Sequence, residues 1–167
     1  QFDNNNAEQH MRVGEICQRE VVTIGNTPDV VEAARLMREK HVGFLVVLQE
    51  DDALRRPVGV LTDRDIVLQV TAPAVDERDV TVEDLMTRQP LIAKEDDDLS
   101  EVLQAMRLAG VRRVPVVDVR GSLVGIVAID DAIEFITGLL CDITGSIKRG
   151  QRQERYVRPA DLVSVSS

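Results

Sequence analysis

Apolar and polar residues alternate along the chain in two different periods. Between 28 and 40, apolar residues recur at the three- and four-residue spacing of a helix face: Val30, Ala33, Ala34 and Met37. Short runs rich in valine and leucine predict buried strands, at 21–24, 44–49 and 57–62. A last apolar run at 65–70 predicts a closing helix. The expected order is therefore strand, helix, strand, strand, helix.

This order of elements occurs twice in the sequence. A shift of 69 residues places Val13 on Val82 and Met37 on Met106, and the register continues without a gap over about 35 residues. It then changes by three residues, so that GVLTDRD matches GIVAIDD. A unit of roughly 55–60 residues is too small to bury its own sheet face well. We therefore expect two β-α-β-β-α units of mixed α/β (α+β) class, packed through their sheets as a pseudo-twofold pair.

The residues at the ends of these elements support the assignment. Thr27 is the expected N-cap of the first helix, with Pro28 and Asp29 in its first turn. The equivalent helix of the second unit begins in a run of acidic residues and is expected to stop at Gly110. The pair Arg120–Gly121 marks the turn between the last two strands.

Composition and charge set the boundaries of the units. We expect units at 11–76 and 77–144, between a polar lead at 1–10, vector-derived or disordered, and a basic tail at 145–167. The tail carries five basic and two acidic residues in a chain of net charge −9. It is expected to be a flexible arm or a helix packed on a neighbouring protomer. Nucleic-acid binding through it is an alternative that the acidic chain disfavours.

Residue usage excludes several other classes of protein. Aromatic residues make up 2% of the chain, so stacking platforms for single-stranded nucleic acid are not expected. Cys17 and Cys141 lie in no CxxC motif, which favours idle thiols in a reducing cytoplasm over a disulfide framework or a zinc site. No run reaches the ~18 apolar residues of a membrane span, and no signal peptide is visible. We expect a cytoplasmic protein with an aliphatic core.

The stretch GVLTDRD, at 59–65, places unusual polarity between two apolar runs. Thr62 or Asp63 suits the N-cap of the helix that follows. Asp65 offers two acceptor atoms to the paired hydroxyl groups of a ribose, and the first N–H groups of a helix favour an anion. Asp63 and Asp65 are also a candidate catalytic pair, although no histidine or nucleophile elbow lies nearby. The residues alone favour capping.

Over residues 13–140 the chain resembles the tandem CBS (cystathionine-β-synthase) domain pair, or Bateman module, of the stand-alone bacterial type. The matching segments are MREKHVGFLVV, MRLAGVRRVPVVD, GVLTDRD, VEDLMTRQPLIA and, in part, GIVAIDD. The resemblance implies a regulatory module, not an enzyme, that binds AMP, ADP, ATP, S-adenosylmethionine or an NAD-type dinucleotide in the cleft between units. It also implies a homodimer that regulates a partner protein and requires no cofactor.

For the first cleft, the resemblance assigns ribose binding to Asp65 and a phosphate or ribose contact to Thr62. Arg64 is expected either to face the phosphates or to pair on the surface with Asp63 or Glu50. The adenine is expected against residues that also suit the core: Leu85, Pro90, Leu91, Ile92 and Val111.

The second cleft departs from this pattern. Asp131 keeps the ribose position, but Ala128 replaces Thr62 and removes a hydroxyl group. Asp130 adds an acid that would repel phosphate. The two clefts are therefore expected to bind with unequal affinity, or one of them to stay empty.

A basic pair distinguishes the second unit. Arg112 and Arg113 stand where the first unit has Gly43 and Phe44, and their planar donors suit a phosphate unless they extend into solvent. The adenine of this cleft is expected against Ile16, Val21, Val22, Thr23 and Val42.

The remaining polar features do not predict a metal site. His41 has no second histidine at ligand spacing and suits a helix end, and the acidic run 95–98 suits a helix N-terminus. The main alternative to ligand sensing is a structural dimerisation or partner-docking module with vestigial clefts. The hydroxyl lost at Ala128 favours this alternative slightly.

Overall fold

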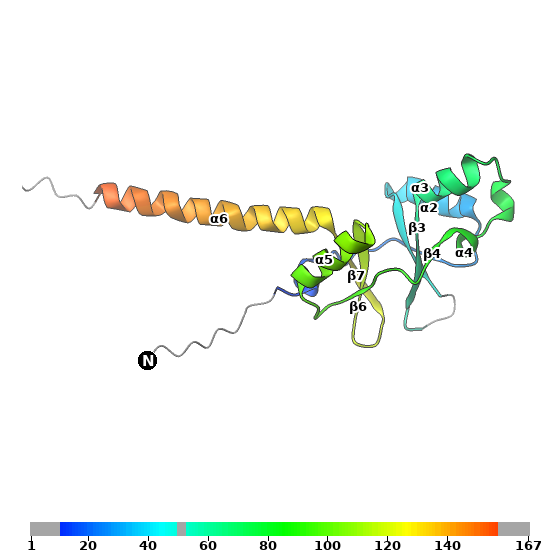
Figure 1. Ribbon diagram of the computed structural model, residues 1–167, viewed down its shortest axis with the longest axis horizontal. Helices are drawn as coiled ribbons and strands as arrows, with labels where there is room; N and C mark the ends of the chain where they lie inside the picture. Colours follow the sequence, from blue (N-terminus) through cyan, green and yellow to red (C-terminus); the bar gives the residue numbers. More distant parts are fainter. Residues whose placement is uncertain (1–10, 50–52, 157–167) are drawn as a thin grey trace, which may run out of the picture. The chain divides into compact units, whose positions relative to one another are not determined.

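The computed structural model describes residues 11–49 and 53–156 and contains the predicted repeat (Figure 1). The first half comprises α1 (Val13–Ile16), β1 (Thr23–Gly25), α2 (Val30–Lys40), β2 (Phe44–Leu48), β3 (Pro57–Thr62) and α3 (Asp63–Ile66). A π-helical segment over Val67–Thr71 extends α3, and a short 3-10 turn follows at Glu77–Asp79. The second half comprises α4 (Val82–Leu85), β4 (Thr87–Arg88), β5 (Ala93–Lys94), α5 (Leu99–Ala109), β6 (Arg113–Val117), β7 (Leu123–Ala128) and α6 (Ile129–Tyr156).

The strands form two small mixed sheets, which confirms the predicted α/β class. In the first sheet β1 pairs parallel with β2, and β2, β3 and β4 follow as antiparallel neighbours. In the second sheet β5 pairs parallel with β6, and β6 pairs antiparallel with β7. The helix between the two parallel strands of each half provides the crossover that such a pair requires.

One helix boundary differs from the prediction. The N-cap of α2 is Asp29, whose carboxylate accepts a 2.8 Å hydrogen bond from the Glu32 N–H, and Thr27 lies outside the helix. A carboxylate at the N-cap also complements the helix dipole, which explains why the aspartate takes this position. The second helix agrees with the prediction, since Asp98 caps α5 and Gly110 ends it with a left-handed φ of 68°.

The two halves exchange the segments that precede their first strands. α1 belongs to the first half in sequence, but the Val13 N–H donates to the Asp97 carbonyl of the second half at 3.0 Å. In the same way, the Val82 N–H at the start of α4 donates to the Pro28 carbonyl of the first half at 2.9 Å. These two bonds are related by the 69-residue shift of the sequence repeat, so each half completes the other.

Glycines allow the exchanged segments to approach the strands. A Cβ atom on Gly125 of β7 would lie 2.8 Å from both the Cys17 Sγ and the Gln18 carbonyl oxygen. Gly59 of β3 takes the equivalent position against the Met86 side chain. A side chain at either glycine would push the exchanged segment away.

Each half has its own aliphatic core, and each core includes residues from the exchanged segments. The first core contains Val82, Leu85 and Met86 from the second half of the sequence. The second core contains Val13, with Ile16 and Cys17 packed against it. Separating the halves would therefore expose both cores to water.

The chain divides into two compact units, residues 1–129 and 130–167. The first unit contains both sheets, and the second contains all of α6 after its first residue. α6 is the closing helix of the second half, and it also takes in 145–156, the first part of the basic tail. Within the part of the chain that the structure describes, no helix is both long and apolar enough to cross a membrane.

Candidate functional site

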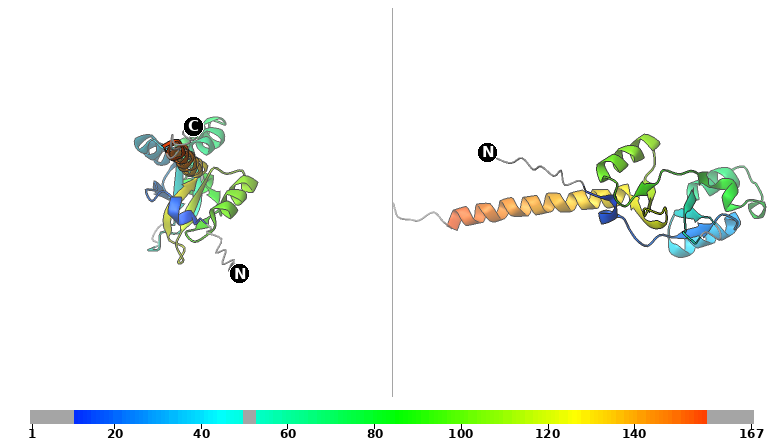
Figure 2. Two further views of the ribbon diagram at one scale, coloured as in Figure 1. Left: turned by 90° about the vertical axis from the view of Figure 1, so that its left-hand side faces the viewer. Right: turned by 90° about the horizontal axis from the view of Figure 1, so that it is seen from below.

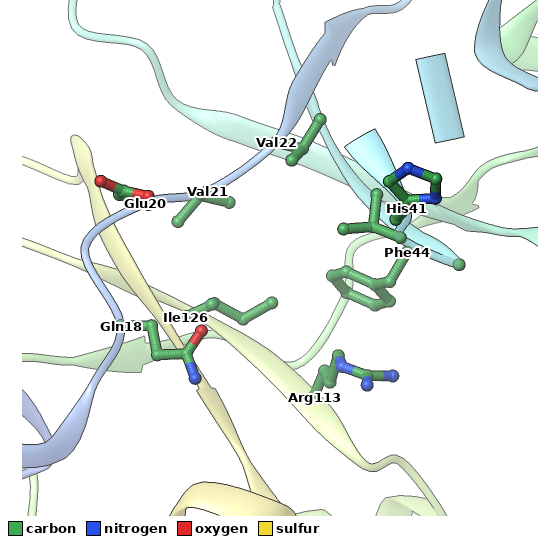
Figure 3. A pocket seen from close by; sticks show the side chains of 10 residues that line it. Gln18, Glu20, Val21, Val22, His41, Phe44, Arg113 and Ile126 are labelled. Carbon is green, nitrogen blue, oxygen red and sulfur yellow. The ribbon is translucent and has the colours of Figure 1, made fainter. Parts of the chain in front are cut away.

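A pocket of about 250 Å³ lies in the first compact unit, where the exchanged segment 18–22 meets both halves. Its lining residues come from that segment, from the end of α2 and the start of β2, and from β6 and β7 (Figure 3): Gln18, Glu20, Val21, Val22, His41, Val42, Gly43, Phe44, Arg113 and Ile126.

Backbone hydrogen bonds hold both ends of the segment 18–22. Gln18 pairs with Ile126 of β7 through two reciprocal N–H···O bonds of 2.9 Å. At the other end, the Val22 carbonyl accepts a bond of 3.2 Å from the Val46 N–H in β2. The segment therefore runs from the second sheet to the first and forms one wall of the pocket.

The Arg19 side chain fixes the same segment from outside the pocket. Its guanidinium donates to Glu95 Oε1 at 2.6 Å and to the Gly14 carbonyl at 3.0 Å. The hydrogen bond that Arg19 donates to Glu95 raises the pKa of Arg19, so the guanidinium stays charged. Burial raises the pKa of the neighbouring Cys17 thiol, so this cysteine stays protonated and unreactive at neutral pH.

Apolar and polar side chains are separated in the pocket. Val22, Phe44 and Ile126 supply apolar surface, and Figure 3 shows Gln18 and Glu20 on one side of them, with His41 and Arg113 on the other. Arg113 is exposed, and its side chain makes no hydrogen bond or ion pair with any described residue. The site can therefore accept a ligand with an apolar ring and an anionic end.

The turn after α2 brings His41, Val42 and Gly43 to the pocket. His41 ends α2 in the left-handed region, with φ 55°, and confirms the prediction of a helix-end histidine. Gly43 packs tightly against Asp63. A Cβ atom on this glycine would lie only 2.6 Å from the Asp63 carboxylate, so a larger residue would not fit without a shift. Asp63 also donates its backbone N–H to the Gly43 carbonyl at 3.1 Å. Asp63 thus acts in the structure by fixing this turn.

Four of the residues predicted for the second cleft line this pocket: Val21, Val22, Val42 and Arg113. The other three residues predicted for this cleft that belong to the first compact unit do not line the pocket. Ile16 packs against the second core, Thr23 begins β1, and Arg112 is exposed, with its carbonyl accepting from the Ile129 N–H at 3.0 Å.

The structure gives Thr62 and Asp65 a capping function. Thr62 is the N-cap of α3, and its Oγ1 donates to Asp65 Oδ2 at 2.6 Å. The Thr62 N–H donates to the same oxygen at 2.9 Å, and the Asp65 N–H donates back to Thr62 Oγ1 at 3.2 Å. Among the described residues, none donates to the second carboxylate oxygen of Asp65, which leaves it open to a ligand.

Thr81 and Asp84 form the same capping box at the start of α4. Thr81 Oγ1 donates to Asp84 Oδ2 at 2.6 Å, and the backbone bonds measure 3.0 and 3.3 Å. The Thr81 hydroxyl lowers the pKa of Asp84, because the bond favours the ionised carboxylate. Two such boxes in one chain show that this hydrogen-bond pattern is sufficient for capping and does not by itself indicate ligand binding.

The other residues predicted for the first cleft lie mainly in the cores. Leu85 is buried in the first core, and Leu91 and Val111 pack against the second. Pro90 is half-buried, whereas Ile92 and Arg64 are exposed. None of these residues lines the pocket described above.

Asp130 and Asp131 lie in the first turn of α6, in the second compact unit. Asp130 is exposed and Asp131 is half-buried. Two acids at this end complement the helix dipole, and their predicted roles in ligand binding remain predictions. Within 11–49 and 53–156, no three His, Cys, Asp or Glu side chains come together as a metal site.

Sequence reasoning did not assign several pocket residues to a site: Gln18, Glu20, His41, Gly43, Phe44 and Ile126. Phe44 carried a usable signal, because the chain has only three phenylalanines and no tryptophan. An aromatic residue in so aliphatic a sequence suggests contact with another ring. Gln18 and Ile126 carried none, because their proximity results from the exchange of segments between the halves.

Both halves of the chain are similar to known proteins. A family model described as CBS domain matches residues 13–71 and 82–138, which confirms the predicted tandem repeat. An uncharacterised protein from Methanopyrus kandleri is 33% identical over 141 residues, which cover 84% of this chain and 70% of that protein.

Solved structures share the fold. A CBS domain protein from Pyrobaculum aerophilum, solved with AMP, is 29% identical and gives a TM-score of 0.66 over 72% of this chain and 89% of that one. The CBS domain pair of protein MJ0100, solved with 5′-methylthioadenosine and S-adenosyl-L-methionine, is 28% identical and gives a TM-score of 0.63, covering 77% and 98% of the two chains.

Proposed function

The chain belongs to the CBS domain family, and on that basis we propose that it is a regulatory module whose pocket at segment 18–22 binds an adenosyl ligand. The observation that carries the proposal is the pocket itself. It joins an apolar surface that contains an aromatic ring to an exposed arginine, Arg113, and both halves contribute to it.

The apolar surface suits an adenine base. Phe44 and Ile126 come from different halves and both line the pocket. A flat heteroaromatic ring placed between them gains contact with the phenyl ring and loses contact with water. Gln18 and Glu20 lie beside this surface and offer acceptors to the amino group of the base or to the ribose hydroxyl groups.

The basic side of the pocket suits a phosphate. Arg113 carries a guanidinium with a planar set of donors and has no described partner that a phosphate would have to displace. His41 adds a second donor near it. A cavity of about 250 Å³ is small beside the roughly 300–1,000 Å³ usual for ligand pockets. A mononucleotide such as AMP therefore fits better than a dinucleotide such as NAD.

The structural relatives support the class of ligand. One was solved with AMP, and another with 5′-methylthioadenosine and S-adenosyl-L-methionine. Adenosine is the part that these ligands share, and the charge differs beyond it. In this chain the exposed Arg113 favours an anionic group at that end, so we rank AMP and ADP above S-adenosylmethionine.

The first cleft is proposed as a weaker site. Thr62, Arg64 and Asp65 remain its proposed polar contacts, but one Asp65 oxygen is already used by the capping box. A ribose bound there is limited to the other oxygen unless the cap opens. This limit gives a structural reason for the unequal affinity expected from the sequence.

A ligand in the pocket would bias the arrangement of the two halves. The residues around it belong to the turn after α2 and to strands β6 and β7, which the segment 18–22 connects. A ligand that contacts all of these stabilises the arrangement in which they are close together. We propose that this shift is the signal read by a protein partner, within a homodimer.

Calorimetric titration with AMP, ADP, ATP, S-adenosylmethionine and NAD tests the proposal. Arg113→Ala is expected to weaken AMP binding by on the order of tenfold or more, which is the loss expected for one charge-assisted contact. Arg38→Ala, an exposed arginine of α2 outside the pocket, is the matched control and is expected to bind as the wild type does. Equal affinities for the two variants would contradict the proposed site.

A structural module with vestigial clefts is the second candidate. The observation that favours it is the capping box, which explains the most polar motif of the chain without a ligand. This candidate predicts no heat of binding with any of the five ligands. A catalytic function has less support, because Asp63 and Asp65 are used in a turn and a cap.

A further inference from the structure

α6 carries a stripe of large apolar side chains that its own compact unit leaves uncovered. Each residue of the stripe has an exposed fraction of 46–57%: Ile133, Ile136, Leu139, Leu140, Ile143 and Ile147. The right view of Figure 2 shows α6 as one continuous helix. So many exposed branched side chains on one helix are typical of an interaction surface.

The spacing of the stripe is that of a coiled-coil seam. Ile133, Ile136, Leu140, Ile143 and Ile147 are separated by alternating steps of three and four residues. This alternation is the a/d pattern that keeps apolar residues facing one partner helix. A broad membrane-binding face requires no such regularity, so the spacing favours another helix as the partner.

The residues beside the seam are suited to burial. Thr137 Oγ1 donates to the Ile133 carbonyl at 2.8 Å, and Ser146 Oγ donates to the Asp142 carbonyl at 3.0 Å. Thr144 Oγ1 donates to the Cys141 carbonyl at 2.8 Å. Because the helix itself satisfies these donors, a partner can cover them without leaving an unpaired polar group.

The composition of α6 indicates that the helix depends on packing. Gly138, Gly145 and Gly150 all lie in its interior, and glycine is the poorest helix former after proline. A helix with three glycines and three serine or threonine residues is marginal in water by itself. Burial of the stripe would supply the missing stabilisation.

We propose that the stripe pairs with α6 of a second copy of this chain, in antiparallel orientation. The distribution of charged residues along α6 favours the antiparallel orientation. Asp130, Asp131 and Glu134 make its first part acidic, and Lys148 and Arg149 make its later part basic. Antiparallel pairing brings opposite charges together, whereas parallel pairing would bring like charges together.

The seam and the charges agree on one register. With Leu140 level with Ile143 of the second copy, Ile136 comes level with Ile147 and Glu134 with Arg149. A parallel pair is disfavoured for a second reason: isoleucine at the d positions, here Ile136 and Ile143, shifts parallel coiled coils to three or four strands. The pairing requires no ligand in the pocket and holds whether or not a nucleotide binds there.

Hydrogen exchange of the full-length protein, measured by mass spectrometry without lipid, provides a local test. The amides of 136–147 are expected to exchange at least about tenfold more slowly at high than at low protein concentration. Leu140→Asp is expected to remove this protection. Val119→Asp, at a residue with an exposed fraction of 91% in the turn between β6 and β7, is the control and is expected to retain it. Circular dichroism checks that both variants fold.

Charge reversal tests the orientation. In sedimentation experiments, Glu134→Arg and Arg149→Glu are each expected to weaken self-association, and the double variant to restore it, since opposite charges again face each other. In a parallel pair each residue would face its own copy, and combining the reversals would restore nothing.

Three results would overturn the pairing. The first is equal exchange of 136–147 in the wild type and Leu140→Asp, and the second is failure of the double charge reversal to restore association. The third is protection of these amides only when vesicles of anionic phospholipid are added, which would assign the stripe to a membrane surface. None of these results bears on the pocket, which calorimetry tests separately.

Discussion

At the scale of single residues, Asp65 and Asp84 share one local structure but have different proposed roles. Each accepts two hydrogen bonds from a threonine three residues earlier and closes a capping box. Only Asp65 lies in a motif that the family resemblance links to ribose. Asp84 can therefore serve as the control that separates the capping role of Asp65 from a role in ligand binding.

We predict that Asp65→Ala and Asp84→Ala lower the melting temperature by similar amounts, about 2–4 °C each, because each loses one cap. Of the two variants, only Asp65→Ala is expected to weaken nucleotide binding at the first cleft, which is the weaker of the two proposed sites. Differential scanning fluorimetry and calorimetry measure the two effects. Unchanged binding in Asp65→Ala would leave this aspartate with a capping role only.

The two cysteines are expected to react at very different rates. Cys141 is exposed on α6, whereas Cys17 is half-buried and burial raises the pKa of its thiol. Because the thiolate is the reactive form, Ellman's reagent at neutral pH is expected to modify Cys141 first. Cys141→Ser should remove the fast phase and Cys17→Ser should retain it. The opposite assignment would contradict the packing of the segment against β7.

At the scale of elements, the helices and strands were predictable and the exchange of segments was not. Periodicity in α2 and α5 is local, and so is the glycine that ends α5. The pairing of Gln18 with Ile126 depends on residues more than a hundred positions apart and leaves no periodic signal. For this reason the sequence predicted Val21, Val22, Val42 and Arg113 among the residues that line the pocket, but not Gln18 or Ile126.

The first two strands also illustrate this limit. The apolar run at 21–24 predicted a strand, and the 69-residue shift places its counterpart at 90–93, but β1 begins only at Thr23 and β5 only at Ala93. The residues before them belong to the exchanged segments. Apolar composition alone does not distinguish a strand from a segment that packs across two sheets.

Gly125 is expected to be more sensitive to substitution than Gly59. Gly125→Ala would press on the Gln18 carbonyl, which is backbone, whereas Gly59→Ala would press on the flexible Met86 side chain. We predict a loss of about 1–3 kcal/mol for Gly125→Ala, a smaller loss for Gly59→Ala, and weaker AMP binding only in the former. Chemical denaturation and calorimetry measure these changes. Equal effects would argue against the role assigned to the Gln18 contact.

Asp118 is expected to contribute to acid sensitivity. It accepts bonds of 2.8 Å from the Ser122 and Arg120 N–H groups, and the Ser122 bond is the main cause of its lowered pKa. A folded pKa below the unfolded one stabilises the fold at high pH, and this contribution is lost as the pH falls below about 3.8.

We therefore predict that Asp118→Asn, which keeps an acceptor but cannot ionise, flattens the dependence of stability on pH below about pH 4. Urea denaturation at several pH values measures this slope. A variant as acid-sensitive as the wild type would show that other carboxylates dominate.

At the scale of the whole molecule, the two halves of the first compact unit share their cores and form a pocket where they meet. Each core includes residues from the other half, so neither half is complete alone. A ligand that binds only the folded unit stabilises it in proportion to the logarithm of its concentration above the dissociation constant. The net charge of −9 does not prevent an anion from binding, because Arg113 presents a local positive charge.

Native mass spectrometry of the protein titrated with AMP tests the central claim most directly, because it counts ligands on each chain. We predict one tightly bound AMP per chain in the wild type, a second only at higher concentration, and loss of the first in Arg113→Ala. The absence of any adduct with AMP, or adducts of equal strength in the wild type and Arg113→Ala, would contradict the proposal that this pocket is a nucleotide site.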